Sequence, residues 1–425
     1  MSLNRTRSPR VSKISGIKLP KSETILLDNG IPVTFLHGLE TEALRLDICF
    51  KVGRQHEHKR MAARATASML KEGSMHFSGK EFAEKMDTLG STWEAPVQLD
   101  YSHFSWLGLS RFAGEALPLI ADILEYPTFP ESEIHAFVQR NITRLKVELT
   151  KPDVVGYRSF TEILLGENHP FGWNSSQTVF ENIHREDLQK HHSDWFCPAM
   201  CSCFLSGNIP KYFMQELNRT LGKLYRGKEN RIQPIIPKVN PTFGHTEIIL
   251  PGTLQSSLHI GYLTGTRQHE DYASLLLLNN ILGGFFGSRL MTSIREKLGY
   301  TYHIQSNLDT YPDVGSLWIN AEMSPEYLHP TRKEIFKEIN KLKNKPVSGS
   351  FLKMVRSYLI GSELNALDGT LQAMEIIRER AMEGLESIDY GIEMERINAV
   401  TPFEIQETAN KYFCEDNFTE VWVTP

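Results

Sequence analysis

The chain has 425 residues, more than one hydrophobic core usually serves, so its length predicts at least two domains. Its 46 Lys and Arg residues against 51 Asp and Glu give a net charge of −5, which argues against a broad basic surface for nucleic acid. No apolar run is long enough to cross a bilayer as a helix, so we expect no membrane span.

Residues 1–22 form a basic segment without the apolar stretch that a secretory signal needs. A transit peptide has a similar composition, but a solvated N-terminal arm is the simpler interpretation. The five cysteines, an odd number, indicate no disulfide framework and favour a reducing compartment. We therefore expect a cytoplasmic protein, or a periplasmic one if a signal has been removed ahead of this sequence.

Three of the cysteines, Cys197, Cys201 and Cys203, lie close together in the sequence. A metal site would need a fourth ligand and usually has Cys-x-x-Cys spacing. Alternation in the strand-like run 200–207 places Cys201 and Cys203 on one face, so we interpret them as small buried residues.

The first half of the chain predicts strands followed by helices. A hairpin is expected at 26–36, where Asn29-Gly30 separates two apolar runs. The next predicted elements are a strand at 44–52, helices at about 58–71 and 79–89, strands at 92–97 and 101–109, and helices at 114–124 and 131–150. Strands joined by turns, with the helices gathered after them, predict an α+β fold with a largely antiparallel mixed sheet and helices packed on one face.

The second half repeats the first with a period of about 210–217 residues. The strand Leu46–Gly53, followed by Arg-Gln-His-Glu, matches Leu258–Gly265, followed by Arg-Gln-His-Glu one residue later. Further matches come in the same order: Met86–Gly90 with Arg295–Gly299, Ser105-Trp106 with Leu317-Trp318, and Trp195–Cys197 with Tyr412–Cys414. The series predicts two homologous domains in tandem, 23–228 and 246–425, joined by the proline-containing linker 229–245.

The order of these features resembles the inverted-zincin peptidase family, which includes pitrilysin, insulinase and mitochondrial processing peptidase. In the second half, Leu282–Leu290 leads into Ile294–Tyr302, which is similar to the signature of the family's C-terminal domain. The similar segments of the first half are 29–33, 52–57, 82–90, 129–134 and 169–172. The resemblance covers nearly the whole chain after the N-terminal arm and implies the family's two-domain α+β fold.

Catalysis in this family depends on a His-x-x-Glu-His helix, in which the two histidines share a face and bind zinc while the Glu activates water. With Met69–Ser74 as the anchor, the resemblance places the histidines on Arg64 and Ser68, the base on Ala67, and a further Glu ligand on Arg144. Alanine accepts no proton, and a guanidinium cannot coordinate a cation. We therefore expect no metal in this chain and no catalysis by it alone.

Two histidine clusters stand near these positions, His56-Glu-His58 and His191-His192. Histidines two residues apart do not share a helix face, so the first cluster is a poor metal site. We interpret it as part of a surface loop, and we give the second cluster no metal role either.

Bacterial members of the family include a similar zinc-less chain whose C-terminal domain contributes an Arg and a Tyr to a composite active site. Arg295 and Tyr302 have the matching spacing of seven residues. By this resemblance they would hydrogen-bond the substrate backbone or its terminal carboxylate. The plain alternative places Arg295 in a helix-surface ion pair and Tyr302 in a strand core.

Gly283, Gly284 and Gly287 resemble the family's glycine-rich loop. We expect a loop here, which either lines the peptide chamber or simply connects two elements.

The resemblance implies a non-catalytic subunit of a heteromeric zinc endopeptidase, which binds a peptide or unfolded protein and completes the active site of a zinc-bearing homologous partner. Zinc is then expected in the partner only, and a homodimer remains an alternative assembly. Two other functions stay open. One is a structural or peptide-binding protein with no role in proteolysis, and the other is a peptidase that uses a different site.

Overall fold

The computed structural model describes residues 16–38, 41–96, 98–224, 235–387 and 389–425. Residues 1–15 of the predicted N-terminal arm and 229–234 of the predicted linker lie outside the described residues. The strands are β1 Glu23–Leu26, β2 Pro32–His37, β3 Ala43–Phe50, β4 Thr92–Glu94, β5 Ser102–Leu109, β6 Cys201–Gly207, β7 Gly244–Ile249, β8 Ser256–Thr264, β9 Thr301–Thr310, β10 Gly315–Met323 and β11 Thr419–Thr424.

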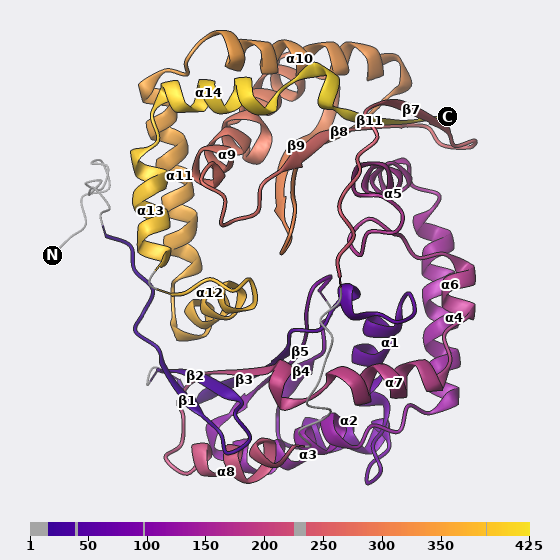
Figure 1. Ribbon diagram of the computed structural model, residues 1–425, viewed down its shortest axis with the longest axis vertical. Coiled ribbons are helices and arrows are strands. Elements are labelled where there is room, and N and C mark those ends of the chain that lie inside the picture. The colour runs from indigo at the N-terminus through magenta and orange to yellow at the C-terminus, as the bar shows by residue number, and fades with distance from the viewer. Residues whose placement is uncertain (1–15, 39–40, 97, 225–234, 388) are drawn as a thin grey trace, which may run out of the picture.

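Helices surround these strands in both halves of the chain (Figure 1). They are α1 Ala62–Met69, α2 Gly79–Thr88, α3 Ala113–Glu125, α4 Glu131–Glu148, α5 Pro152–Leu165, α6 Gln177–Glu181, α7 Arg185–Trp195, α8 Phe213–Thr220, α9 Tyr272–Asn279, α10 Leu328–Asn344, α11 Gly349–Ala366, α12 Thr370–Met382, α13 Asp389–Ala399 and α14 Pro402–Tyr412. None of the helices in this described part of the chain combines the length and apolar character that crossing a bilayer requires.

The strands form two mixed sheets with the same topology. The first has the order β1-β2-β6-β3-β5-β4 and the second β7-β11-β8-β10-β9. Only β2–β6 and β7–β11 are parallel pairs, at equivalent places in the two sheets. Apart from the additional strand β1, each strand of the first sheet has a counterpart in the second. The predicted α+β fold, with two largely antiparallel mixed sheets, is confirmed.

The internal repeat is also visible in single residues. Gly90 and Gly299, which were matched by sequence, both adopt a left-handed conformation, with φ of 60° and 66°. Each comes just after a helical segment, where glycine ends a helix at the lowest conformational cost. The predicted Asn29-Gly30 turn likewise joins two antiparallel strands, β1 and β2, and Gly30 has φ 89°.

Each sheet packs its main core against helices of its own half, but the opposite face is covered by a helix from the other half (Figure 1). Helix α5, from the first half, packs on β8 and β11 of the second sheet. Helix α12, from the second half, packs on β2 and β6 of the first sheet. The two halves of the sequence are therefore interlocked by an exchange of helices.

Buried polar pairs hold both exchanged helices. Arg378 of α12 lies 3.3 Å from the fully buried carboxylate of Asp47 on β3. Asp153, in the first turn of α5, lies 3.4 Å from the buried imidazole of His259 on β8. Asp47 and His259 occupy equivalent positions in the sequence repeat, so the same strand position anchors the incoming helix in both halves.

The fit of α5 to the second sheet requires a glycine at position 156. A Cβ atom there would lie 2.5 Å from Nδ1 of His259 and 2.8 Å from Oγ of Ser257. We expect Gly156→Ala to lower the free energy of unfolding by about 1–3 kcal/mol, because the added methyl group would force α5 away from the sheet. Urea denaturation measures this change.

Gly361 provides the matched control, because it also lies within a helix but a Cβ atom there meets nothing within 4 Å. We expect Gly361→Ala to be neutral or to stabilise by about 0.5–1 kcal/mol through helix propensity. Equal effects of the two substitutions would show that the close approach of α5 is not a constraint.

Candidate functional site

The four positions that the family resemblance assigns to the zinc site lie on two helices of the first half. Arg64, Ala67 and Ser68 are on α1 and Arg144 is on α4, which packs against α1. Ala67 is buried, and Arg64 is partly exposed. Burial and the neighbouring Arg144 guanidinium both lower the pKa of Arg64. The fold therefore brings Arg64 and Arg144 close enough to repel each other.

These side chains do not fit a zinc ion. Both guanidinium groups are hydrogen-bond donors without an acceptor atom, and the methyl group of Ala67 has no polar atom. Arg144 is exposed and its Nε donates to Glu148 at 2.7 Å, so its charge is balanced by a carboxylate of its own helix. Two cations would also oppose a third positive charge between them. The register that assigns these positions stays a prediction.

Glu57, in the segment just before α1, has a buried carboxyl oxygen and was not singled out by sequence analysis. Its Oε1 accepts a hydrogen bond from the backbone N–H of Ala63 at 2.9 Å. Burial raises the pKa of Glu57 to about 7, although the backbone N–H groups of the helix start oppose this shift. A carboxylate at a helix N-terminus satisfies free N–H groups there. Glu57 thus caps the helix that carries Arg64.

The expected surface loop at 56–58 was wrong for its first residue. Residues Arg54–His56 form a short 3-10 turn, and the His56 side chain is 6% exposed and packs edge-on against Trp195, with ring centroids 4.5 Å apart. Helix α1 begins later than the expected 58, at Ala62, because Met61 adopts a left-handed conformation with φ 79°. The predicted start of this helix was based on hydrophobic periodicity, which does not reveal a left-handed residue.

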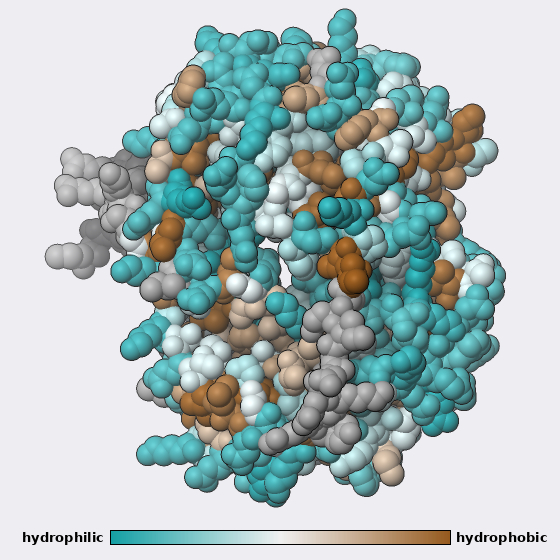
Figure 2. Space-filling model, in the orientation of Figure 1, coloured by the Kyte–Doolittle hydropathy of each residue, from teal (hydrophilic) through white to brown (hydrophobic). Residues whose placement is uncertain are grey.

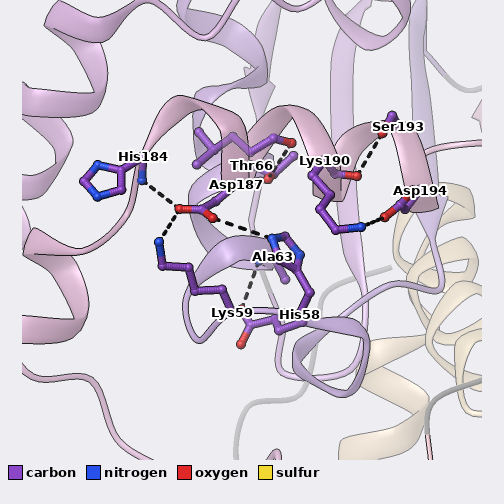
Figure 3. A network of polar contacts seen from close by, with 11 residues as sticks. His58, Lys59, Ala63, Thr66, His184, Asp187, Lys190, Ser193 and Asp194 are labelled. Carbon is purple, nitrogen blue, oxygen red and sulfur yellow. Dashed lines mark hydrogen bonds and ion pairs between the residues drawn. The ribbon is translucent and has the colours of Figure 1, made fainter.

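Helix α7 packs against α1 and forms polar contacts with α1 and with the segment before it (Figure 3). Asp187 of α7 lies between two side chains of the segment before α1, with its carboxylate 2.6 Å from Nζ of Lys59 and 3.7 Å from Nε2 of His58. The hydroxyl of Thr66 on α1 donates to the carbonyl of Leu188 on α7 at 3.4 Å. These contacts fix α1 without any metal ligand.

The other candidate metal residues are buried in packing roles. His191 is fully buried on α7, and burial lowers its pKa to about 3, so it stays neutral. Cys201 and Cys203 both contribute to the first core, as their alternation predicted. Within the described ranges, no group of three or more His, Cys, Asp or Glu side chains is placed to hold a metal ion.

Arg295 and Tyr302 lie on two elements of the second half that contact each other, the helical segment Met291–Lys297 and β9. Arg295 is on the helical segment Met291–Lys297, and its guanidinium lies 5.1 Å from the ring centroid of Phe286. No carboxylate pairs with it among the residues that the structure describes. Its five N–H donors therefore remain available beside an aromatic face that is itself 62% exposed.

Tyr302 is turned outward by a β-bulge. The pairing of β9 with β10 shifts register here, since His303 faces Glu322 while Thr301 faces Met323, which leaves Tyr302 as the extra residue. The Thr301 hydroxyl fixes the bulge by accepting from the N–H of His303 at 3.0 Å and donating to the carbonyl of Glu322. Tyr302 is 91% exposed as a result. Bulges commonly re-aim a side chain near functional sites.

The glycine segment is helical in its first part, not a loop. A wide helical turn, Asn280–Gly284, continues α9, and the chain turns only after it. Gly283 is buried, and a Cβ atom there would lie 2.6 Å from the backbone nitrogen of Ser306 on β9. Its role is to let the helix approach the strand closely. Gly284 is exposed and Gly287 is partly exposed.

A cavity of about 330 Å³ lies where the two halves meet, lined in part by Tyr101, Tyr311 and Arg267. Glu383 and Glu393 each approach Arg267 to 3.1 Å, so the cation in the cavity wall is already paired. The cavity lies at the contact between the two halves, and neither Arg295 nor Tyr302 lines it.

Comparisons with known proteins agree with this architecture. Residues 182–358 match the family described as "Peptidase M16 inactive domain". The chain is 23% identical over 399 residues to the uncharacterized zinc protease YmxG of Bacillus subtilis, covering 91% of this chain and 95% of that protein. Two solved structures have a similar fold over 96% of this chain. They are a protease from Helicobacter pylori (TM-score 0.88, 18% identity, all of that chain) and a peptidase M16 inactive domain from Pseudomonas fluorescens (TM-score 0.84, 23% identity, 98% of that chain).

The raised pKa of Glu57 predicts a pH-dependent stability. The folded pKa of about 7 lies above the ordinary value of 4.5, so its contribution is fully present below about pH 4.5 and is lost as pH rises through 7. Glu57→Gln should remove this dependence while it keeps the cap. Between pH 5 and 8, we expect the free energy of unfolding of the unaltered protein to fall by about 2–3 kcal/mol more than that of the variant, measured by urea denaturation.

Glu81→Gln is the control, since Glu81 also caps a helix start but is exposed, and hydrogen bonds from Ser78 lower its pKa. Its contribution is present above its ordinary pKa and is lost only at acid pH. If Glu57→Gln and Glu81→Gln changed the profile between pH 5 and 8 equally, Glu57 would not carry the effect.

Proposed function

Since the chain belongs to the M16 peptidase family, as an inactive peptidase-like member, we propose that it is the non-catalytic subunit of a heteromeric zinc endopeptidase. It binds peptide substrate and completes the active site of a zinc-bearing homologous partner. The observation that carries this proposal is the exposed Tyr302, turned out by a bulge, on a strand that contacts the helical segment of Arg295, which pairs with no carboxylate of the described chain.

Folding stability does not explain why Tyr302 is held in an exposed position. A Tyr side chain that is 91% exposed contributes almost no burial, and Thr301 stabilises the bulge that holds it outward. An Arg over an aromatic ring keeps its orientation while its donors stay free. Structure of this kind is maintained at functional sites more often than at ordinary surfaces.

The chemistry of the pair suits a peptide. A guanidinium presents parallel N–H donors to a carboxylate or to a polarised carbonyl, and a phenol hydroxyl donates to a carbonyl or oxyanion. The first half supplies nothing comparable, because Arg64, Ala67 and Ser68 offer neither a zinc ligand nor a base. Zinc and the activated water must then come from a partner, and this chain holds and polarises the substrate.

The cysteines favour a reducing compartment for this assembly. None of the five, all of which the structure describes, is in a disulfide bond, and four of them are buried, including the strand residues Cys201 and Cys203. A chain whose cysteines pack as apolar residues has no need of an oxidising environment. We propose that the protein acts in the cytoplasm.

Arg295 and Tyr302 can be tested by mixing the chain with a zinc-bearing relative from the same genome and measuring peptide hydrolysis. We expect the mixture to exceed the sum of the separate activities. Arg295→Ala and Tyr302→Phe should each lower kcat/KM of the mixture by about 10- to 100-fold, because each removes a hydrogen bond to substrate worth about 1.5–3 kcal/mol.

Arg289→Ala and Tyr358→Phe are matched controls. Arg289 precedes the same helical segment but already lies 3.4 Å from Glu338, and Tyr358 is 48% exposed and stacks on Phe285. Both variants should keep the activity of the mixture. If the unaltered chain adds nothing to the relative's own rate, or if Arg295→Ala behaves like Arg289→Ala, then the chain has a structural or peptide-binding role without a part in proteolysis.

A further inference from the structure

The outer edge of the second sheet is an exposed strand. Among the strands that the structure describes, β7 is the last on its side and pairs only with β11, in parallel. Five of its six residues are exposed. Edge strands present unpaired N–H and C=O groups, and proteins usually protect them with Pro, Lys or a covering loop. β7, with the sequence Gly-His-Thr-Glu-Ile-Ile, has neither Pro nor Lys.

The hydrogen bonds to β11 show which backbone groups of β7 face outward. Gly244 donates to the carbonyl of Phe418 at 2.9 Å, and Leu250 donates to the carbonyl of Thr424 at 2.7 Å. In a parallel pair, alternate residues direct both backbone groups to the same neighbour. Residues with even numbers therefore bond to β11. His245, Glu247 and Ile249 direct their N–H and C=O groups away from the sheet.

Apolar side chains surround this edge. Ile249 is 70% exposed, Leu254 in the following turn is 89% exposed, and Phe243 just before β7 is 48% exposed. Figure 2 shows hydrophobic surface gathered at the upper right, where β7 and its turn emerge in Figure 1. Unpaired backbone and apolar side chains together favour an extended strand as the partner.

The sequence of β7 complements itself. We propose that β7 pairs antiparallel with β7 of a second copy of this chain, about a twofold axis at Thr246, so that the two second sheets join into one. In this register His245 faces Glu247 of the second copy, and Phe243 faces Ile249 of the second copy. Each facing pair comes from residues whose backbone groups point outward, so each can exchange two backbone hydrogen bonds.

Charge selects this register over its neighbour. An axis at Glu247 would set two carboxylates directly opposite each other, which destabilises a strand pair. The axis at Thr246 instead sets two threonines face to face and matches an imidazole with a carboxylate on both sides. The contact is isologous, so it closes at two copies and covers the β7 edge of both.

This dimer leaves the proposed peptide site free. Tyr302 lies in β9, at the opposite edge of the same sheet, and Arg295 lies on the helical segment that precedes β9. The inference concerns the chain alone and does not depend on a zinc-bearing partner. A six-residue strand pair with four apolar side chains is small for an interface, so we expect a reversible dimer with Kd of about 1–100 μM.

Sedimentation velocity of the full chain over about 1–200 μM tests this pairing. We expect conversion from monomer to dimer, together with protection of the β7 amides from hydrogen exchange as concentration rises. Ile249→Ser should raise Kd about 10- to 30-fold. Leu26→Ser is its matched control, because Leu26 is also the last residue of an edge strand and is 71% exposed, but it lies on the first sheet. It should leave Kd unchanged.

Two further variants separate pairing from folding. Glu247→Pro removes an outward N–H and no backbone hydrogen bond to β11. Within the monomer it removes only the exposed hydrogen bond that Glu247 accepts from the Thr424 hydroxyl at 3.2 Å, so the monomer should lose little stability while the dimer is lost. His245→Glu and Glu247→His should each weaken the dimer, and the double exchange should restore it in part. Restoration is incomplete because the exchange also removes the contact of the His245 ring with Trp422, whose centroids lie 4.1 Å apart. A chain that stays monomeric over this range overturns the proposal. So do equal effects of Ile249→Ser and Leu26→Ser, a failed restoration, or β7 protection that appears only with a different protein.

Discussion

The buried contact between Arg378 and Asp47 is the constraint on which the two-half architecture depends. Asp47 is inaccessible to solvent in the middle of the first sheet, and Arg45 also approaches it, at 3.1 Å. A carboxylate in that position is costly unless cations compensate it, and one of them comes from the other half of the chain. Helix α12 is thus required by the first sheet, although its sequence lies far away.

His259 of the second sheet and Asp153 of α5 form the reciprocal pair in this exchange of helices. Here the acidic residue is on the incoming helix and not on the sheet. The first sheet offers an acid to an incoming base, and the second offers an imidazole to an incoming acid. Neither half has a complete second layer of its own, so the halves form one interlocked unit. That unit fixes where Arg295 and Tyr302 lie relative to helix α1. The same duplicated fold therefore has no metal-binding group among its described residues, while its second half carries a partly exposed Arg295 and an exposed Tyr302.

Local patterns predicted most elements of the fold. The Asn29-Gly30 hairpin, helix α2 and the glycine after each matched helix follow from turn chemistry and periodicity, which act within a few residues. The match of Ser105-Trp106 with Leu317-Trp318 was misleading. Pairing sets Ser105 opposite Asp47 and Asn320 opposite His259, so Trp106 lies in the main core while Trp318 packs toward α5. Period-2 alternation cannot reveal which face a strand residue takes when both faces are buried.

Three features of the structure could not be predicted from sequence patterns, because they depend on tertiary contacts or on an unusual backbone conformation. The exchange of α5 and α12 depends on contacts between distant segments. The burial of Glu57 depends on the left-handed turn at Met61. The exposure of Tyr302 depends on a bulge that Thr301 fixes across two strands. The spacing of Arg295 and Tyr302 was visible in the sequence, whereas their availability to a ligand became clear only in three dimensions.

Native mass spectrometry with zinc present tests the central claim most directly, because it counts metal ions and chains at once. The account predicts that the isolated chain carries no zinc and that its complex with a zinc-bearing relative carries one zinc for each pair of unlike chains. One zinc on the isolated chain, together with chelator-sensitive peptide hydrolysis by it, would contradict the account.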